Sequence, residues 1–576
     1  MTRTRWARGL GTLGTAMLLA GAGPGAAQVS LPTRQEVTPP TPDRQAESTA
    51  SVDARAALTQ PACPFDRSSL RLTLKAVRFT RPDGGALPPP IAALLEPLTA
   101  PEGDQSIRVV CDLRDRANAA LQRAGWVASV QIPAQEINGG ELVLQVVTGR
   151  IVEVRVRGDA GPYQSLLRVR IERIKALDPL NEHEAERLLL LAGDTPGLQV
   201  QLSLRPAGTE QGAVVGELSV QFRRYSLLAN TQNYNSRLLG RESFYLRGEL
   251  YGLTGLSDLT YVGASASYDF HRQVIAQAGH VMGLDASGTT LGVRGTYAWS
   301  RPDLGALDYR TDTLIAGVDL QHPLLRSLRR NVRARAGFDF INQISTVGSN
   351  GTGVPLTTDK LRVFFLGVDG DYRRTRFDGA TAFSLTGGIE VRKGAGLFGA
   401  SKVGFVDGVL TSRPDGDARA LVVRGSTDVV VGLGRVFSVA GGVQGQWADR
   451  ALLNYEELAV GNLTIGRGYD PGAASGDRVV GGRGELRAEI PVTRVFGTQL
   501  YGFYDHEYVN NLDRALIEND RTYRSVGGGA RFALPGRLLL ELAYAHPLDK
   551  ASIRDDRRPS DRLLLSLTAQ FRGPAR

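Results

Sequence analysis

Hydrophobic and polar residues alternate at every second position over much of the chain beyond residue 226. In the clearest stretch, Val332, Ala334, Ala336, Phe338 and Phe340 alternate with Arg333, Arg335, Gly337 and Asp339. Residues 484–490 repeat the pattern, which predicts strands with two unlike faces. Charges at this spacing would be costly in a soluble sandwich core, whereas a water-filled lumen accepts them. We therefore predict an all-β transmembrane barrel over residues 225–576, with about 16 antiparallel strands.

Two segments before the barrel each combine strand and helix patterns. In residues 63–149 we predict a strand (70–79), a helix (113–124) ended by Gly125, and two strands (127–132 and 142–147). Residues 150–224 repeat this order with a strand (151–156), a helix (182–192) and a hairpin (200–204 with 218–222). Asn181 and Glu184 supply the spacing of a capping box for the second helix. The sequence thus predicts two small α+β domains.

Residues 28–62 are rich in proline and poor in apolar side chains, which is typical of a flexible linker. Within this linker, residues 43–58 carry a poor apolar stripe. One interpretation is a weak helix that plugs the barrel. The other, which we prefer, is a disordered segment.

The first 27 residues have the pattern of a secretory signal peptide. Arg3, Arg5 and Arg8 precede a short apolar core over residues 10–20, and small residues at 25–27 fit a cleavage site. The apolar core is too short to span a bilayer, and no later run of about 18 apolar residues occurs. We expect an exported protein and exclude a bundle of transmembrane helices.

The chain has only two cysteines, Cys63 and Cys111, and both lie in the first α+β domain. Export places them in an oxidising compartment, so we expect a disulfide. By the chain-entropy relation, a loop of this size would stabilise the domain by about 4 kcal/mol. The alternative is a pair of buried free thiols.

The composition argues against nucleic-acid binding and against catalysis. The formal charge is +9, but the arginines are scattered at strand spacing and do not cluster with aromatic residues, so a basic lumen explains them. His183 and Glu184 begin like a zinc-protease helix, but Arg187 occupies the second histidine position. A dinucleotide loop at Gly466 fails because Pro471 replaces the third glycine. We expect no enzymatic activity, no cofactor and no metal.

Two motifs in the predicted barrel carry a resemblance to a known family. The first is Arg467-Gly468-Tyr469, within residues 465–469 and ahead of Asp470-Pro471 and Gly476-Asp477; the second is Phe503-Tyr504-Asp505. With two units that resemble POTRA domains, they are similar to the outer-membrane transporters of two-partner secretion. In that family the first motif lies at the tip of a long extracellular loop that folds back into the barrel. Gly466 departs from the valine usual there.

The resemblance implies roles for these residues. Arg467 and Asp505 would form a salt bridge between the loop and the wall, because a guanidinium matches a carboxylate and stays charged in a confined lumen. The parity of the strand supports this pairing, since Phe503 and Asp505 fall on the lumen side. Gly468 would let the loop tip turn tightly.

The C-terminal strand ends in Phe571, which resembles the terminal aromatic residue that the barrel-assembly machinery reads in such proteins. Here residues 572–576 follow it, and so the position of the assembly signal departs from the usual pattern.

The resemblance also implies a function. The protein would lie in the outer membrane of a Gram-negative bacterium, in contact with its lipid, with the POTRA domains in the periplasm. It would recognise a large partner protein through that partner's N-terminal secretion domain and export it. Two other functions stay open from the residues: a factor that assembles outer-membrane proteins, and a diffusion porin.

Overall fold

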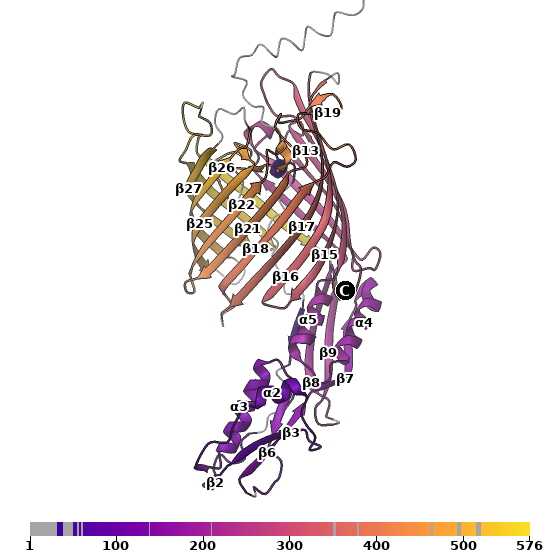
Figure 1. Cartoon of the computed structure of the whole chain (residues 1–576), viewed down its shortest axis with the longest axis vertical. Coiled ribbons are helices and arrows are strands. Elements are labelled where there is room, and N and C mark those ends of the chain that lie inside the picture. The colour runs from indigo at the N-terminus through magenta and orange to yellow at the C-terminus, as the bar shows by residue number, and fades with distance from the viewer. Residues whose placement is uncertain are drawn as a thin grey trace, which may run out of the picture.

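The computed structural model describes residues 32–38, 50–54, 57–58, 62–137, 139–208, 210–348, 353–376, 379–461, 465–491, 497–513, 520–553 and 555–575. Figure 1 shows a barrel with two small α+β units below it, and the C-terminus lies where these two parts meet. The predicted signal peptide, residues 1–27, lies outside the described residues.

The first α+β unit is a three-stranded sheet packed with two helices. Its strands lie in the order β3 (Ala76–Thr80), β6 (Glu141–Thr148) and β5 (Ala128–Gln131). Apolar residues of α2 (Pro89–Leu95) and α3 (Val109–Arg123) form one core with this sheet. Two short strands, β2 (Arg71–Thr73) and β4 (Asp104–Ser106), pair separately. The single strand that we predicted over residues 70–79 is therefore wrong, because the chain breaks there into β2 and β3.

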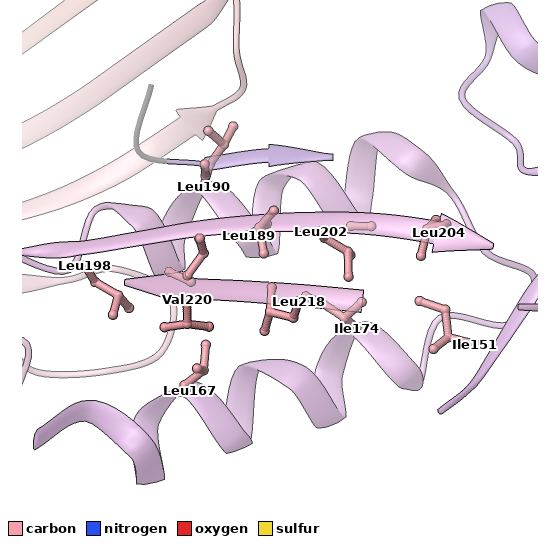
Figure 2. Close-up of a cluster of buried hydrophobic side chains, with 14 of the residues drawn as sticks. Ile151, Leu167, Ile174, Leu189, Leu190, Leu198, Leu202, Leu204, Leu218 and Val220 are labelled. Atoms are coloured by element: carbon pink, nitrogen blue, oxygen red, sulfur yellow. The ribbon is translucent and has the colours of Figure 1, made fainter. Parts of the chain in front are cut away.

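The second α+β unit has a four-stranded sheet in the order β1 (Ala50–Asp53), β8 (Leu198–Pro206), β9 (Ala213–Phe222) and β7 (Arg150–Gly158). The helices α4 (Gln164–Lys175) and α5 (Glu182–Gly193) follow β7, α4 directly after the short η1 (Gly161–Tyr163). Figure 2 shows leucine and isoleucine side chains from both helices meeting those of β8 and β9. Fully burying one such side chain stabilises the fold by about 1.5–3 kcal/mol.

Two details of this unit differ from the sequence analysis. We did not predict α4, although Leu167, Ile171 and Ile174 have helical spacing. At the start of α5, the Asn181 side chain accepts a hydrogen bond from the His183 N–H, at 2.9 Å. This is one residue before the position that a capping box uses, so the capping residue was predicted correctly and its partner was not.

Part of the predicted linker belongs to the second unit. β1 pairs in parallel with β8, with Ala50 opposite Val200. Ala50 and Ala57 are buried in the core of the unit. The weak helix considered over residues 43–58 is wrong for Ala50–Asp53, which are extended. Residues 43–49 lie outside the described residues.

Sixteen antiparallel strands form the closed barrel, as predicted. The last strand pairs with the first, from Ser226 opposite Arg572 to Gln232 opposite Ser566. In order around the wall the strands are β10 (Tyr225–Gln232), β11 (Ser243–Tyr251), β12 (Leu259–Ser267), β13 (Gln273–Gly283), β14 (Thr290–Ser300), β15 (Tyr309–Arg326), β16 (Arg330–Val347), β17 (Val354–Thr375), β18 (Thr381–Gly394), β21 (Leu421–Gly432), β22 (Phe437–Ala448), β25 (Arg478–Pro491), β26 (Gly497–Asn510), β27 (Asp520–Leu534), β28 (Leu538–Pro547) and β29 (Arg562–Arg572).

The two faces of the barrel wall differ as the alternation predicts. On β26, Leu500 and Tyr504 are 44% and 45% exposed on the outside, whereas Phe503 and Asp505 are buried on the lumen side. On β25, Leu486 points outward and Glu485 inward. The parity that we assigned to Asp505 is therefore confirmed. None of the described helices is long and apolar enough to cross a membrane.

Polar contacts join the second α+β unit to the turns at the near end of the barrel. Tyr163 donates a hydrogen bond from its hydroxyl to the Asp258 carbonyl, at 3.1 Å. Arg326 forms an ion pair with Asp194, with 2.7 Å between Nη2 and Oδ1. These contacts attach the unit to the lower end of the barrel, where α5 and β9 lie in Figure 1.

A short N-terminal segment, residues 32–38, lies inside the barrel. It contains α1 (Arg34–Val37), whose backbone is held by glutamines of the wall. Gln273 donates to the Glu36 carbonyl at 3.1 Å, and Gln343 donates to the Pro32 carbonyl at 3.0 Å. Val37 packs on an apolar strip of the lumen wall made by Ile275, Ala298, Ile315, Ile341, Leu361 and Val363. A piece of the predicted linker thus fills part of the lumen, and it precedes residues 43–58, which we considered as a plug.

Candidate functional site

The loop between β22 and β25, residues 449–477, folds into the lumen; we call it the inner loop. It contains η3 (Asn454–Glu456) and a hairpin of β23 (Leu458–Ala459) with β24 (Ser475–Gly476). Residues 462–464 lie outside the described residues. Tyr469 and Asp477 are fully shielded from solvent. The inner loop is therefore packed, whereas connecting loops normally run over the surface.

Arg467, at the tip of the inner loop, forms a two-pronged ion pair with Asp505 of β26. Its Nη2 lies 2.6 Å from Oδ1 and its Nε 2.9 Å from Oδ2, and the backbone N–H of Arg467 also donates to Oδ2 at 3.1 Å. Both residues are buried, with exposed fractions of 4% and 0%. The guanidinium carbon lies 3.6 Å from the centre of the Phe503 ring. The structure thus brings Arg467, Phe503 and Asp505 together.

A second carboxylate shares Arg467, and our sequence analysis missed it. Glu485 of β25 accepts a hydrogen bond from Nη1 of Arg467 at 2.5 Å. The same side chain is paired with Arg487 at 2.6 Å and Arg531 at 3.4 Å. The alternation on β25 places Glu485 on the lumen face, and this signal was available in the sequence. The tip of the inner loop is therefore fixed by a network and not by one ion pair.

The two glycines beside Arg467 have different roles from those we predicted. Gly466, and not Gly468, has a positive φ, of 76°. A Cβ on Gly466 would lie 3.1 Å from the buried Glu507 carboxylate. A Cβ on Gly468 would lie 2.7 Å from the Ser525 Cβ and 2.9 Å from the Pro547 nitrogen. Gly468 thus allows the backbone to approach the wall closely, while Gly466 makes the turn.

Tyr469 and Asp470 extend the contact of the tip to other strands and loops. The Tyr469 hydroxyl donates to the Arg524 carbonyl at 2.8 Å and accepts from the Asp549 N–H at 3.0 Å. Asp470 is paired with Arg241, at 3.1 Å. The tip therefore contacts the wall near β27 and the loops that follow β10 and β28.

The rim of the barrel holds the inner loop through a buried arginine in the loop that follows β18. Arg413 contacts Asp477 at 2.6 Å and Glu457 at 2.5 Å, both in the inner loop, and Asp513 in the loop after β26. Burial raises the pKa of Glu457 to about 7, although the charge of Arg413 lowers it. Asp477, which we quoted only as part of the first motif, is thus a structural contact of the loop.

The other residues singled out from the sequence lie away from the lumen. Cys63 and Cys111 form a disulfide, with 5.8 Å between their Cα atoms, beside the start of α3. Phe571 is 54% exposed on the outer face of β29 and lies opposite Leu227 of β10. Arg572 still belongs to the strand, so β29 extends one residue past Phe571.

Comparisons with known proteins bear on this arrangement. A sequence profile of the haemolysin secretion/activation proteins ShlB, FhaC and HecB matches residues 218–531, which is more than half of the chain. The chain belongs to this family. Haemolysin secretion/activation proteins are transporters, not enzymes, that export partner proteins across the outer membrane of Gram-negative bacteria by two-partner secretion.

Among the relatives, the heme/hemopexin transporter protein HuxB of Haemophilus influenzae is 23% identical over 439 residues, covering 73% of this chain and 74% of HuxB. Two solved structures share the fold. CdiB from Escherichia coli matches with a TM-score of 0.66 and 15% identity over 90% of this chain and 94% of its own. CdiB from Acinetobacter baumannii matches with a TM-score of 0.62 and 16% identity over 89% and 95%.

Proposed function

We propose that this transporter captures its cargo in the periplasm and releases it through the barrel after the inner loop moves. The two α+β units, residues 63–149 and 150–224, act as periplasmic POTRA domains. They bind the extended N-terminal secretion domain of the cargo, and residues 225–576 conduct the chain outward. Folding of the cargo at the cell surface supplies the driving force, because the periplasm offers no nucleotide.

The observation that carries the proposed opening step is the buried contact of Arg467 with Asp505 and Glu485. This contact fixes the tip of the inner loop across the lumen that the cargo must cross. The ion pairs of an arginine buried between two carboxylates hold it in position, and they break and re-form without any covalent change. We assign Arg467 and Asp505 to holding the resting state of the channel.

The capture step is supported by an exposed sheet edge. β7 ends the sheet of the second unit, and its side chains Val152 and Val156 are 40% and 47% exposed. An extended chain adds to such an edge by backbone hydrogen bonds, while the apolar side chains give specificity. We also assign Phe571 to recognition by the barrel-assembly machinery, and the outward apolar side chains to contact with lipid.

A lysine substitution at the edge tests capture. Charged residues on an edge strand oppose the addition of another strand, so Val156→Lys in the full-length protein is expected to weaken binding of a purified cargo secretion domain at least tenfold. Val169→Lys is the matched control, because Val169 is 50% exposed on α4 and is not part of the edge strand. Equal affinity of the two variants would show that the cargo does not bind along β7.

A further inference from the structure

The base of the inner loop, residues 453–457, is attached to a different part of the wall from the tip. Glu456 accepts hydrogen bonds from Arg392 of β18, at 3.1 and 2.8 Å, and from Arg424 of β21, at 2.8 Å. Arg424 also donates to the backbone carbonyl of Glu456, at 2.7 Å. The Arg392 and Glu456 side chains are each 5% exposed. One carboxylate thus holds two guanidinium groups in a confined site, where such charge-assisted bonds are strong.

The arginines that hold Glu456 are themselves placed by the wall. Arg392 also contacts Asp339 of β16 at 3.1 Å and Glu390 at 3.2 Å. Asp339 in turn accepts from Arg294 of β14 at 2.5 Å. Loss of the Glu456 charge would therefore leave Arg392 with other carboxylates, and the wall would not be left with a bare buried cation.

The same loop base contacts the N-terminal segment. Asn454 donates from its side chain to the Pro32 carbonyl, at 3.3 Å. Leu453 and Tyr455 form one apolar cluster with Val37 and with the strip of the lumen wall. Residues 453–455 thus contact the segment at Pro32 and pack in one cluster with Val37, and Glu456 follows them directly in the chain.

We propose that Glu456 is a positioning residue that keeps the N-terminal segment, residues 32–38, inside the lumen. Its ion pairs with Arg392 and Arg424 hold residues 453–455 against the segment. This attachment is separate from the Arg467 contact at the tip. Glu457, one residue further, is bound to Arg413 at the rim. Closure of the channel therefore depends on a carboxylate that acts through the base of the inner loop.

The test uses one engineered thiol in the full-length protein. Val37 is fully buried, and the two native cysteines are bonded to each other, so Val37→Cys adds a single free thiol at the covered face of the segment. A bulky, charged maleimide measures how often this face is open. No cargo is needed, so the outcome is independent of the proposed capture and export steps.

In the Val37→Cys background, Glu456→Gln and Glu456→Ala are expected to speed labelling at least tenfold and to increase the conductance of the protein in planar bilayers. Glu489→Gln, at an exposed glutamate of β25 outside the inner loop, is the matched control and should leave the labelling rate within about twofold of the parent. Heat-modifiable migration shows that each barrel has folded. Unchanged labelling in both folded Glu456 variants overturns the proposal. So does equal acceleration by Glu489→Gln, because the effect would then not depend on the Arg392 and Arg424 pairs.

Discussion

Replacing Arg467 with alanine should undock the tip of the inner loop. The substitution removes a guanidinium that contacts Asp505 at 2.6 Å and Glu485 at 2.5 Å. Removing one partner of a buried pair costs about 3–5 kcal/mol. Because Glu485 keeps Arg487 at 2.6 Å, the uncompensated charge is mainly Asp505, and the lower end of this range applies. At 1.4 kcal/mol per tenfold, about 3 kcal/mol lowers the ratio of docked to undocked loop roughly 100-fold.

Asp505→Ala and Arg467→Lys should each destabilise the docked loop less than Arg467→Ala does. Asp505→Ala leaves Arg467 paired with Glu485 and stacked on Phe503, so we expect the smaller loss of a charged hydrogen bond, about 1.5–3 kcal/mol. Arg467→Lys should rescue only in part, because an ammonium group lacks the two-pronged geometry. The double variant of Arg467 and Asp505 should be no worse than Arg467→Ala alone, since the two side chains make one contact.

The assay is cargo in the culture medium, normalised to heat-modifiable barrel in the outer membrane. Arg301→Ala, at an exposed position after β14, serves as the control for loss of an arginine. If Arg467→Ala secretes like the parent, the contact has no role in export. If the losses of the double variant equal the sum of the single losses, the two residues act separately and the reasoning fails.

Three further predictions follow from other contacts. Gly468→Ala should reduce secretion at least tenfold because the facing strand is too close for a Cβ, whereas Gly484→Ala, with nothing within 4 Å, should secrete normally. Reduction of the Cys63–Cys111 disulfide should lower the free energy of unfolding of the first unit by about 4 kcal/mol, measured by urea unfolding of the full-length protein. Two free thiols in exported protein would show that the disulfide does not form. Burial raises the pKa of Glu36 from 4.5 to about 6, so the lumen segment favours its protonated form. Docking should be strongest below pH 4.5 and weaken by about 2 kcal/mol as the pH rises to 6, so bilayer conductance should rise over this interval, and Glu36→Gln should remove that slope.

The barrel was predictable from strand periodicity, whereas the tip contact was predicted from the family resemblance of the two motifs and was only supported by periodicity. Alternation fixes which side chains face the lumen, and this placed Phe503 and Asp505 on the side where Arg467 arrives. The same alternation also places Glu485 of β25 on the lumen side. It was missed because its pairing with Arg467 depends on the register of β25 against β26, with Arg483 opposite Asp505, which one sequence does not show.

The contents of the lumen were not predictable from periodicity. Residues 32–38 form a short, polar stretch that begins with proline and is followed by two more, and nothing in their local pattern distinguishes them from a linker. Their position comes from tertiary contacts with Gln273, Gln343 and Asn454, which are far away in sequence. β1 is extended for the same reason, because its hydrogen bonds come from β8 and not from its own segment.

The several attachments of the inner loop bear on how tightly cargo is held. When a ligand binds only the open form of a protein, its apparent affinity is the intrinsic affinity multiplied by the fraction of protein that is open. The Arg467, Glu456 and Arg413 contacts raise the ratio of resting to open channel. For cargo that binds inside the lumen, each tenfold increase in this ratio lowers the apparent affinity tenfold. Barrier function and sensitivity to cargo oppose each other in this channel. Variants that leak small solutes should hold an engaged cargo chain more tightly than the parent does.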